Sequence, residues 1–250
     1  MTLHRIRKRA NERAEDALLR MLDSPDFAPG ERIPAERDLA LQLDISRMTL
    51  RKAIARLVEQ GILRRDGNRG TFVADTEVRR PLSERDARGV SSIVELNGGR
   101  AGSRLLYFEQ TPASPRLAHA LGLADEQPLL AIRRLRTIDD KPFCVETSYL
   151  PAARVPGLVA ADLIESGSLY RLLETRYHLA PGSDEGTLQS VELSNEDARL
   201  LGLPAGSSGL VYRGVVFDAV SNTPMEYVVS INHPHRVAFT LSNRRLSIQA

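Results

Sequence analysis

Two arginines, Arg134 and Arg136, stand two positions apart in an apolar segment with the composition of a β-strand. Alternate residues of a strand point to the same face, so both guanidinium groups can converge on one carboxylate or phosphate, while Arg133 points the other way. Glu146 lies on the strand expected next along the chain, where it can accept hydrogen bonds from ligand hydroxyl groups or pair with an arginine. The pattern favours an anion site, and solubilising charge on an edge strand is the alternative.

A second concentration of charge lies near the N-terminus. Residues 46–73 hold seven basic side chains against Glu59 and Asp66, a local excess of +5 (7 − 2), and the basic ones are Arg47, Arg51, Lys52, Arg56, Arg64, Arg65 and Arg69. Phosphate contacts dominate nucleic-acid affinity, so this stretch indicates a polyanionic partner. A solvated helix face is the other interpretation of the same residues.

The elements that would position these basic residues follow from hydrophobic spacing. Apolar side chains recur at helical intervals over residues 6–22, a second short helix is expected from Glu36 to Leu43, and Ser46 is a suitable N-cap for a third helix that ends near Gln60. Two short strands, 62–65 and 71–74, then flank a glycine-rich turn. The order predicts a winged helix-turn-helix over residues 1–75, whose third helix would enter the major groove of DNA.

The rest of the chain contains an internal repeat. The pattern Ala118-x-x-Leu121-Gly122-Leu123 returns 80 residues later as Ala198-x-x-Leu201-Gly202-Leu203, and each copy follows a capping serine, Ser114 or Ser194. Each copy precedes a predicted hairpin, over residues 129–150 and 210–231. Two strand–helix–hairpin units predict one α+β domain over residues 92–250, with pseudo-twofold symmetry and an antiparallel sheet. Residues 76–91 show little apolar periodicity and are expected to be an exposed linker.

Composition limits the class of protein. Cys144 is the single cysteine, so a disulfide framework and a cysteine-rich metal site are excluded, and a reducing compartment is expected. The N-terminal region has no signal-peptide pattern, and no run of about 18 apolar residues occurs, so we expect a cytoplasmic protein without membrane contact. His233 and His235 have no acidic or cysteine partner nearby in sequence, so no metal and no cofactor are expected.

Three separated motifs in the first 75 residues resemble the GntR family of bacterial regulators. They are Pro29-Gly30-Glu31-Arg32-Ile33-Pro34-Ala35-Glu36-Arg37-Asp38-Leu39-Ala40, Ser46-Arg47-Met48-Thr49-Leu50-Arg51-Lys52-Ala53 and Gly67-Asn68-Arg69-Gly70-Thr71-Phe72-Val73. The resemblance implies DNA contacts from Arg37, Arg47, Thr49, Arg51 and Gly70. We add Ser46 at the start of the third helix and Arg69 at the wing tip, where an arginine suits the minor groove or is simply solvated. The chain departs from the family at Ala35, where serine is usual, and so loses an N-cap worth roughly 1 kcal/mol.

The second half resembles the UTRA domain of the HutC subfamily, which is similar in fold to chorismate lyase. The matching motifs are Arg134-Leu135-Arg136, Lys141-Pro142 with Glu146, Ser148-Tyr149-Leu150-Pro151, Ser168-Leu169-Tyr170 and Pro224-Met225-Glu226. The resemblance implies a pocket lined by Arg134, Arg136, Glu146, Ser168, Tyr170 and Glu226, with Ser103 in a glycine-containing loop as an anion contact. Ser168 can equally be only a helix cap. Arg236 is a further candidate, although the segment around it, His233-Pro234-His235-Arg236-Val237, departs from the Arg-Gly-Asp-Arg-Tyr of many relatives.

The resemblances together imply a homodimeric transcription regulator, a repressor, that binds double-stranded DNA at a palindromic operator and responds to a small anionic effector such as a sugar phosphate or organic acid. Two alternatives stay open: a lyase-like enzyme on the same fold, and a DNA-binding protein whose second domain serves only dimerisation. A pyridoxal-phosphate aminotransferase is excluded because the second half is too short, and because Lys141 is the only lysine after residue 75.

Overall fold

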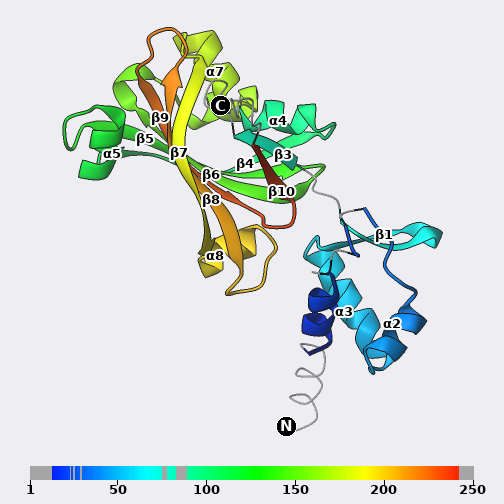
Figure 1. Ribbon diagram of the computed structural model, residues 1–250. Coiled ribbons are helices and arrows are strands. Elements are labelled where there is room, and N and C mark those ends of the chain that lie inside the picture. Colours follow the sequence, from blue (N-terminus) through cyan, green and yellow to red (C-terminus); the bar gives the residue numbers. More distant parts are fainter. Residues whose placement is uncertain are drawn as a thin grey trace, which may run out of the picture. The chain divides into compact units, whose positions relative to one another are not determined.

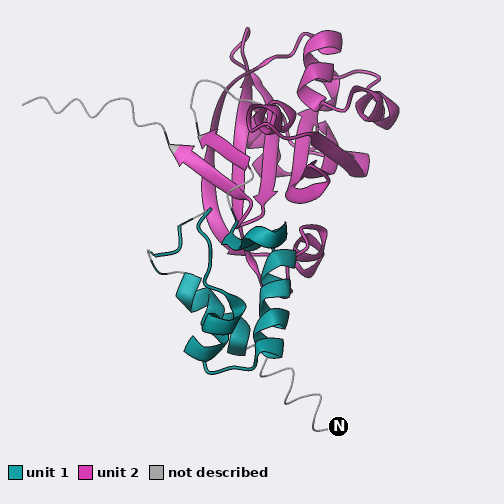
Figure 2. Cartoon of the chain, turned by 90° about the vertical axis from the view of Figure 1, so that its right-hand side faces the viewer, with its two compact units in different colours: residues 1–76 teal, residues 77–250 magenta. Residues whose placement is uncertain are grey.

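The computed structural model describes residues 13–22, 24, 26–28, 30–74, 78–82 and 89–241. The chain divides into two compact units, Met1–Thr76 and Glu77–Ala250, which Figure 2 colours separately. The first part of the predicted N-terminal helix lies outside the described residues. None of the helices in the described ranges is long and apolar enough to cross a membrane.

The N-terminal unit is built on a helix over residues 13–22, α2 (Glu36–Gln42) and α3 (Arg47–Glu59) (Figure 1). Their apolar faces meet in one core, to which each contributes fully buried side chains, among them Leu18, Leu39 and Leu50. Ser46 caps α3, because its hydroxyl accepts a hydrogen bond from the Thr49 amide at 3.1 Å. The corresponding position before α2 is Ala35, which makes no side-chain cap. The predicted helix-turn-helix is therefore present.

The wing follows α3. Strand β1 (Leu63–Asp66) pairs antiparallel with β2 (Gly70–Val73), and the tip is the short 3₁₀ helix η1 (Gly67–Arg69). Gly70 has a φ of +118°, and a Cβ there would lie 2.8 Å from Arg32 Nε. The positive φ angle favours glycine at this end of the tip, whereas the flexible Arg32 side chain could move away from a Cβ.

The second unit is organised around a six-stranded antiparallel sheet in the order β4-β5-β6-β9-β8-β7 (Figure 1). One half is β4 (Ala101–Pro112), α5 (Pro115–Leu121), β5 (Pro128–Ile138) and β6 (Lys141–Pro151). The other is β7 (Pro181–Glu192), α8 (Asn195–Leu200), β8 (Ser208–Asp218) and β9 (Pro224–Asn232). The halves meet where β6 pairs with β9, which confirms the pseudo-twofold repeat.

Helices pack on both faces of this sheet. Helices α6 (Ala160–Ser166) and α7 (Leu169–Tyr177) bury their leucines against Ile132 and other residues of one face. Helix α4 (Val90–Leu96) packs against Ile138, Phe143 and Cys144 at one end of the sheet. Helices α5 and α8 form separate clusters that contain odd-numbered residues of β5, Leu129 and Leu135. Because side chains alternate along a strand, β5 directs its even-numbered residues, arginines 134 and 136 included, towards the α6–α7 face.

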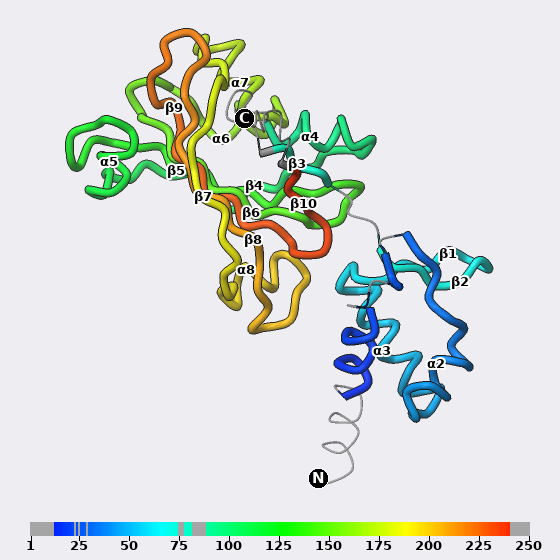
Figure 3. The backbone as a smooth tube through the Cα atoms, viewed as in Figure 1, coloured from blue at the N-terminus to red at the C-terminus, as the bar shows by residue number. Residues whose placement is uncertain are grey.

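A small parallel pair, β3 (Val78–Leu82) and β10 (Val237–Leu241), joins segments far apart in sequence (Figure 3). For residues 78–82 and 89–91, the parts of the predicted linker that the structure describes, the expectation of an exposed linker is corrected, because they form a strand and the start of a helix. Val78 is completely buried in one cluster with Val94 of α4 and Val237 of β10, and α4 itself begins at Val90. The strand was not recognised in the sequence because charged residues surround Val78 and because its partner, β10, lies at the other end of the domain.

Candidate functional site

A cavity of about 730 Å³, its open mouth included, lies beside the sheet in the second unit. Five of the eight predicted pocket residues line it, namely Arg134, Arg136, Glu146, Ser168 and Tyr170. Four polar residues that the sequence did not indicate line it as well, namely Arg80, Ser91, Asp184 and Tyr212. The structure therefore brings most of the predicted residues together.

Glu146 holds the two predicted arginines. It lies directly opposite Arg134 in the β5–β6 register, and its Oε2 accepts a hydrogen bond from Arg134 Nη2 at 2.6 Å, with Arg136 Nη1 at 3.7 Å. Arg136 also donates to Ser91 Oγ of α4 at 2.7 Å. Within the two predicted cavity arginines, three buried guanidinium nitrogens have no hydrogen-bond partner among the described residues: Nε and Nη1 of Arg134 and Nε of Arg136. Buried donors without partners favour a ligand that supplies acceptors.

The charges of this cluster reinforce one another. Burial alone would raise the pKa of the Glu146 carboxyl. The positive charges of Arg134, Arg136 and Arg80 outweigh this effect, so the pKa lies below its usual value. Burial, followed by repulsion from Arg134, lowers the pKa of the Arg136 guanidinium to about 10, so this side chain remains charged at neutral pH. The lining holds three guanidinium groups against two carboxylates, Glu146 and Asp184, and this excess of positive charge favours an anion.

Glu226 lies behind the lining rather than in it. Its carboxylate is buried, and its Oε2 accepts a hydrogen bond from the Tyr170 hydroxyl at 2.6 Å. Burial and the nearby Glu146 raise the pKa of Glu226, although hydrogen bonds and Arg134 oppose the shift. Burial and Glu226 also raise the pKa of Tyr170 well above its usual range. Glu226 therefore acts on the cavity through Tyr170.

Ser168 is a helix cap, and its position also leaves it available to a ligand. Its hydroxyl caps α7 by accepting from the Arg171 amide at 3.4 Å, and the residue lines the cavity. The start of a helix presents backbone N–H groups and the positive end of its dipole, so this position suits an anion.

Besides Glu226, two other predicted residues do not line the cavity. Ser103 lies in strand β4 rather than in a loop, and it is exposed, although the register places it beside Arg136. Arg236 is buried, and its Nη1 donates to the Pro142 carbonyl at 2.7 Å. The neighbouring His233 and His235 rings contact each other edge to face, with centroids 5.9 Å apart.

In the first unit, the predicted DNA contacts lie at the start of α3 and on the wing. Arg47 is exposed and Thr49 half-buried in the first turn of α3. Arg51 of the next turn pairs with Glu36 Oε2 at 3.2 Å, and Arg65 of the wing approaches Glu36 Oε1 at 3.5 Å. Glu36 thereby connects α2, α3 and β1.

The remaining predicted contacts are also at the surface. The Arg37 side chain is 76% exposed beside Asp38, and the Arg69 side chain is 77% exposed with Asp66 at 3.1 Å. Exposed ion pairs of this kind contribute little to stability, so phosphate oxygens can replace these carboxylates at small cost.

Comparison with known proteins decides between the possible families. The model of bacterial regulatory proteins of the gntR family matches residues 10–73, and the UTRA domain matches residues 96–238, more than half of the chain. The protein belongs to the GntR family. Its second unit is a UTRA domain, as the sequence motifs indicated.

Relatives of this GntR regulator match over nearly the whole chain. The transcriptional repressor NagR of Bacillus subtilis is 30% identical over 239 residues, which cover 93% of each chain. The repressor PhnF of Mycolicibacterium smegmatis is 32% identical over 239 residues, 94% of this chain and 92% of PhnF. The crystal structure of PhnF from Mycobacterium smegmatis superposes with a TM-score of 0.61 at 29% identity, over 92% of this chain and 98% of that one. The protein is therefore a DNA-binding transcriptional regulator with an effector-binding domain, not an enzyme.

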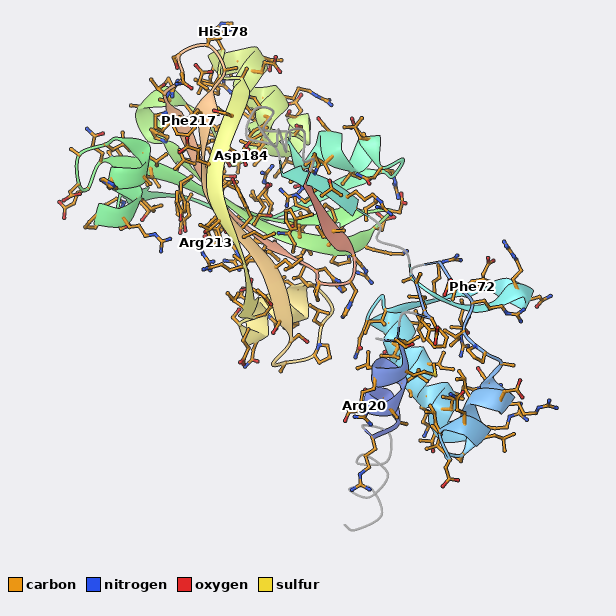
Figure 4. The ribbon with its side chains drawn as sticks, in the orientation of Figure 1. Arg20, Phe72, His178, Asp184, Arg213 and Phe217 are labelled. Carbon is orange, nitrogen blue, oxygen red and sulfur yellow. The ribbon has the colours of Figure 1, made fainter. Side chains whose placement is uncertain are left out.

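The cavity residues that the sequence did not indicate come from distant segments of this UTRA domain. Asp184 lies on β7, labelled in Figure 4, and accepts a hydrogen bond from the Tyr212 hydroxyl of β8 at 2.5 Å. Burial and this bond raise the pKa of Tyr212 above its usual range. Arg80 lies in the segment that was assigned to the linker. The local sequence offers one weak sign of a strand at Arg80: the residues two positions before and after it, Val78 and Leu82, are both apolar.

Proposed function

We propose that the protein is a homodimeric repressor whose affinity for a palindromic operator changes when a small anion, a sugar phosphate or an organic acid, binds in the UTRA cavity. The observation that carries the proposal is the cavity lining, in which Arg134 and Arg136 pair with Glu146 and Arg80 adds a third guanidinium group. Partly buried cations with unused N–H groups are stabilised by a bound anion. Such a regulator acts in the cytoplasm, where bacterial DNA lies.

The DNA-binding half of the proposal rests on exposure and charge. Arg47 and Thr49 stand at the start of α3, the position from which a recognition helix contacts bases, and Arg37 and Arg51 can exchange their exposed carboxylate partners for phosphates. The hydroxyl of Ser46 accepts from the Thr49 amide and forms a second hydrogen bond with the Thr49 hydroxyl at 2.8 Å, so two hydroxyl groups lie together at the start of α3, where a phosphate can be bound.

The wing would complete the contact. The exposed Arg69 suits the minor groove, and Gly70 lets the backbone approach the DNA closely. Two copies of the GntR unit, related by a dimer axis, would fill successive major grooves of a palindrome.

Effector binding would change the spacing of these two GntR units. Coupling between two sites typically amounts to about 1–3 kcal/mol, which changes operator affinity about 5- to 150-fold. A second domain that serves only dimerisation predicts no change at all, so the two functions differ in a measurable quantity.

The test is fluorescence anisotropy of the full chain on DNA from upstream of its own gene, at several salt concentrations, with a panel of sugar phosphates and organic acids. We expect tight, salt-sensitive binding that at least one compound shifts by fivefold or more. Sequence-specific binding that no compound shifts would refute the effector role, and the absence of sequence preference would refute the operator.

Two variants assign the activities to their units. Arg47→Ala should weaken operator binding and leave ligand binding intact, whereas Arg136→Gln should do the reverse. Their charge-matched controls are Arg20→Ala, on the exposed side of the first helix, and Arg213→Gln, on β8 and outside the cavity lining (Figure 4). If either site variant damages both activities equally, the assignment of its residue is wrong.

A further inference from the structure

Arg80 differs from the other two arginines of the cavity in its place along the chain. It lies on β3, the first described element after the GntR unit, and Phe239 lies opposite it in the parallel register of β3 and β10. Its guanidinium also lies over the Phe239 ring, 5.4 Å from the centroid, and both residues line the cavity. The strand that continues the DNA-binding unit therefore contributes directly to the wall of the anion site.

The hydrogen bonds of Arg80 leave part of its guanidinium for a ligand. Nη1 donates to Ser230 Oγ and to Asn232 Oδ1, each at 2.7 Å, and both of these β9 residues are completely buried. Among the residues described, no partner is assigned to Nε or Nη2 of Arg80. One end of the guanidinium is thus anchored to the sheet, which fixes its position, and the other end keeps its donors.

The charges and donors together indicate the kind of anion. The cavity lining holds three guanidinium groups, of Arg80, Arg134 and Arg136, and two carboxylates, Glu146 and Asp184, a net charge of +1 (3 − 2), and Asp184 accepts a hydrogen bond from Tyr212. A carboxylate offers two oxygens, whereas a phosphate monoester offers three terminal oxygens and a charge near −2 at neutral pH. Three guanidinium groups match the three terminal oxygens of a phosphate monoester better than the two oxygens of a carboxylate.

We infer that Arg80 is a third contact of the bound anion. The site is therefore selective for a phosphate monoester over a singly charged group. The same contact links the position of β3 to the presence of the ligand. The inference rests on the proposed function and adds to it a residue, a ligand class and a route by which occupancy reaches the strand that follows the GntR unit. Val78 supports the route, because it anchors the same strand in one core with α4 and β10.

The first test is calorimetric titration of the full chain with sulfate and inorganic phosphate as doubly charged tetrahedral probes, and with nitrate as a singly charged one, at matched ionic strength. Loss of one charge-assisted contact should reduce sulfate and phosphate affinity about tenfold or more in Arg80→Gln, and change nitrate affinity less than threefold. Arg80→Lys keeps the charge and should retain most of the sulfate affinity.

The matched control is Arg79→Gln, which removes the same charge from the adjacent, exposed position of β3, outside the cavity lining. It should leave all three affinities unchanged. Equal effects of Arg79→Gln and Arg80→Gln would overturn the inference, because long-range charge rather than contact would then explain the loss.

Arg136→Gln separates this inference from the proposed function. If sulfate binding is lost in Arg136→Gln but kept in Arg80→Gln, the anion cavity stands and the role of Arg80 falls. If the unmodified protein binds none of the doubly charged probes, the anion cavity itself is refuted.

The second test is amide hydrogen exchange of the peptide that contains residues 78–82. Saturating sulfate should slow the exchange of this peptide in the unmodified protein. In Arg80→Gln, with the sulfate concentration raised until the site is again saturated, the exchange of this peptide should not change. A peptide from β5 should exchange more slowly with sulfate in both proteins. Equal protection of residues 78–82 in the two proteins would show that β3 senses the ligand without Arg80, and would overturn the coupling.

Discussion

Replacement of Glu146 by glutamine is the most informative single change to the UTRA domain. The Glu146 side chain is only 9% exposed, and it stands between Arg134, 4% exposed, and Arg136, 2% exposed. Glutamine keeps an oxygen that can accept from Arg134 Nη2 but removes the one carboxylate, among the described residues, that pairs with the two arginines. The variant therefore leaves two buried cations without a counterion, at nearly unchanged side-chain volume.

The size of the effect follows from the burial of the partners. Removal of one partner from a buried ion pair costs about 3–5 kcal/mol, and the open mouth of the cavity favours the lower end of that range. For a unit of 174 residues (Glu77–Ala250, 250 − 77 + 1), 1 kcal/mol shifts the melting temperature by about 2–4 °C. We expect Glu146→Gln to lower the melting temperature of the second unit by about 10 °C.

The same variant makes a signed prediction about pH. The pKa of Glu146 is lower in the folded protein than in the unfolded chain, so its stabilising contribution is present above the unfolded pKa, near 4.5, and is lost as the pH falls through the folded value. The difference in unfolding free energy between the variant and the unmodified protein should therefore shrink below about pH 4.5.

Thermal denaturation followed by circular dichroism, from pH 3.5 to pH 8, measures both quantities. The control is Glu185→Gln on β7, which removes an exposed carboxylate. Sulfate should stabilise Glu146→Gln more than the unmodified protein, because the anion replaces the lost carboxylate. A variant that unfolds within about 1 kcal/mol of the control at neutral pH would refute the view that the two arginines depend on Glu146.

Two further predictions concern a helix cap and the second buried carboxyl. The backbone angles of Ala35 (φ −61°, ψ 146°) nearly equal those of the capping Ser46 (φ −66°, ψ 144°), so Ala35→Ser should stabilise the N-terminal unit by about 1 kcal/mol in urea denaturation, and an unchanged midpoint would contradict this. The pKa of Glu226 is raised in the folded state, so the stability linked to its protonation is present below its unfolded pKa and lost as the pH rises through the folded value. Glu226→Gln can still accept from Tyr170, and it should therefore gain melting temperature relative to the unmodified protein between pH 4 and pH 8. A difference that does not vary with pH would contradict the raised pKa.

Local patterns predicted the elements that depend on local physics. The Ser46 cap, the apolar stripe of α3 and the glycine-rich wing tip are each determined by neighbours within a few residues, and all three are found where the sequence indicated. The repeat that contains Leu121 and Leu201 predicted the symmetric sheet, because each copy carries its own cap, helix and hairpin.

Contacts between distant segments could not be predicted in this way. The partner of β3 is β10, near the other end of the domain, and nothing in the sequence around Arg80 identifies Phe239 as its neighbour. Asp184 enters the cavity lining through the register of β7 and β8, which no local pattern fixes. The sequence also left open whether Glu146 binds a ligand or pairs with an arginine, and the structure pairs it with two.

The internal repeat has a consequence for how a ligand can be oriented. Arg134 lies opposite Glu146, whereas its equivalent Gly214 lies opposite Val228, so Val228 occupies the place of Glu146, and Glu226 occupies the place of Cys144. The places equivalent to Arg134 and Arg136 are Gly214 and Val216, which carry no charge. The charged cluster of Glu146 and its two arginines therefore has no counterpart in the second half, where all three equivalent positions carry uncharged side chains. A symmetric scaffold has become an asymmetric receptor with one cationic end, so a bound molecule is distinguished head from tail.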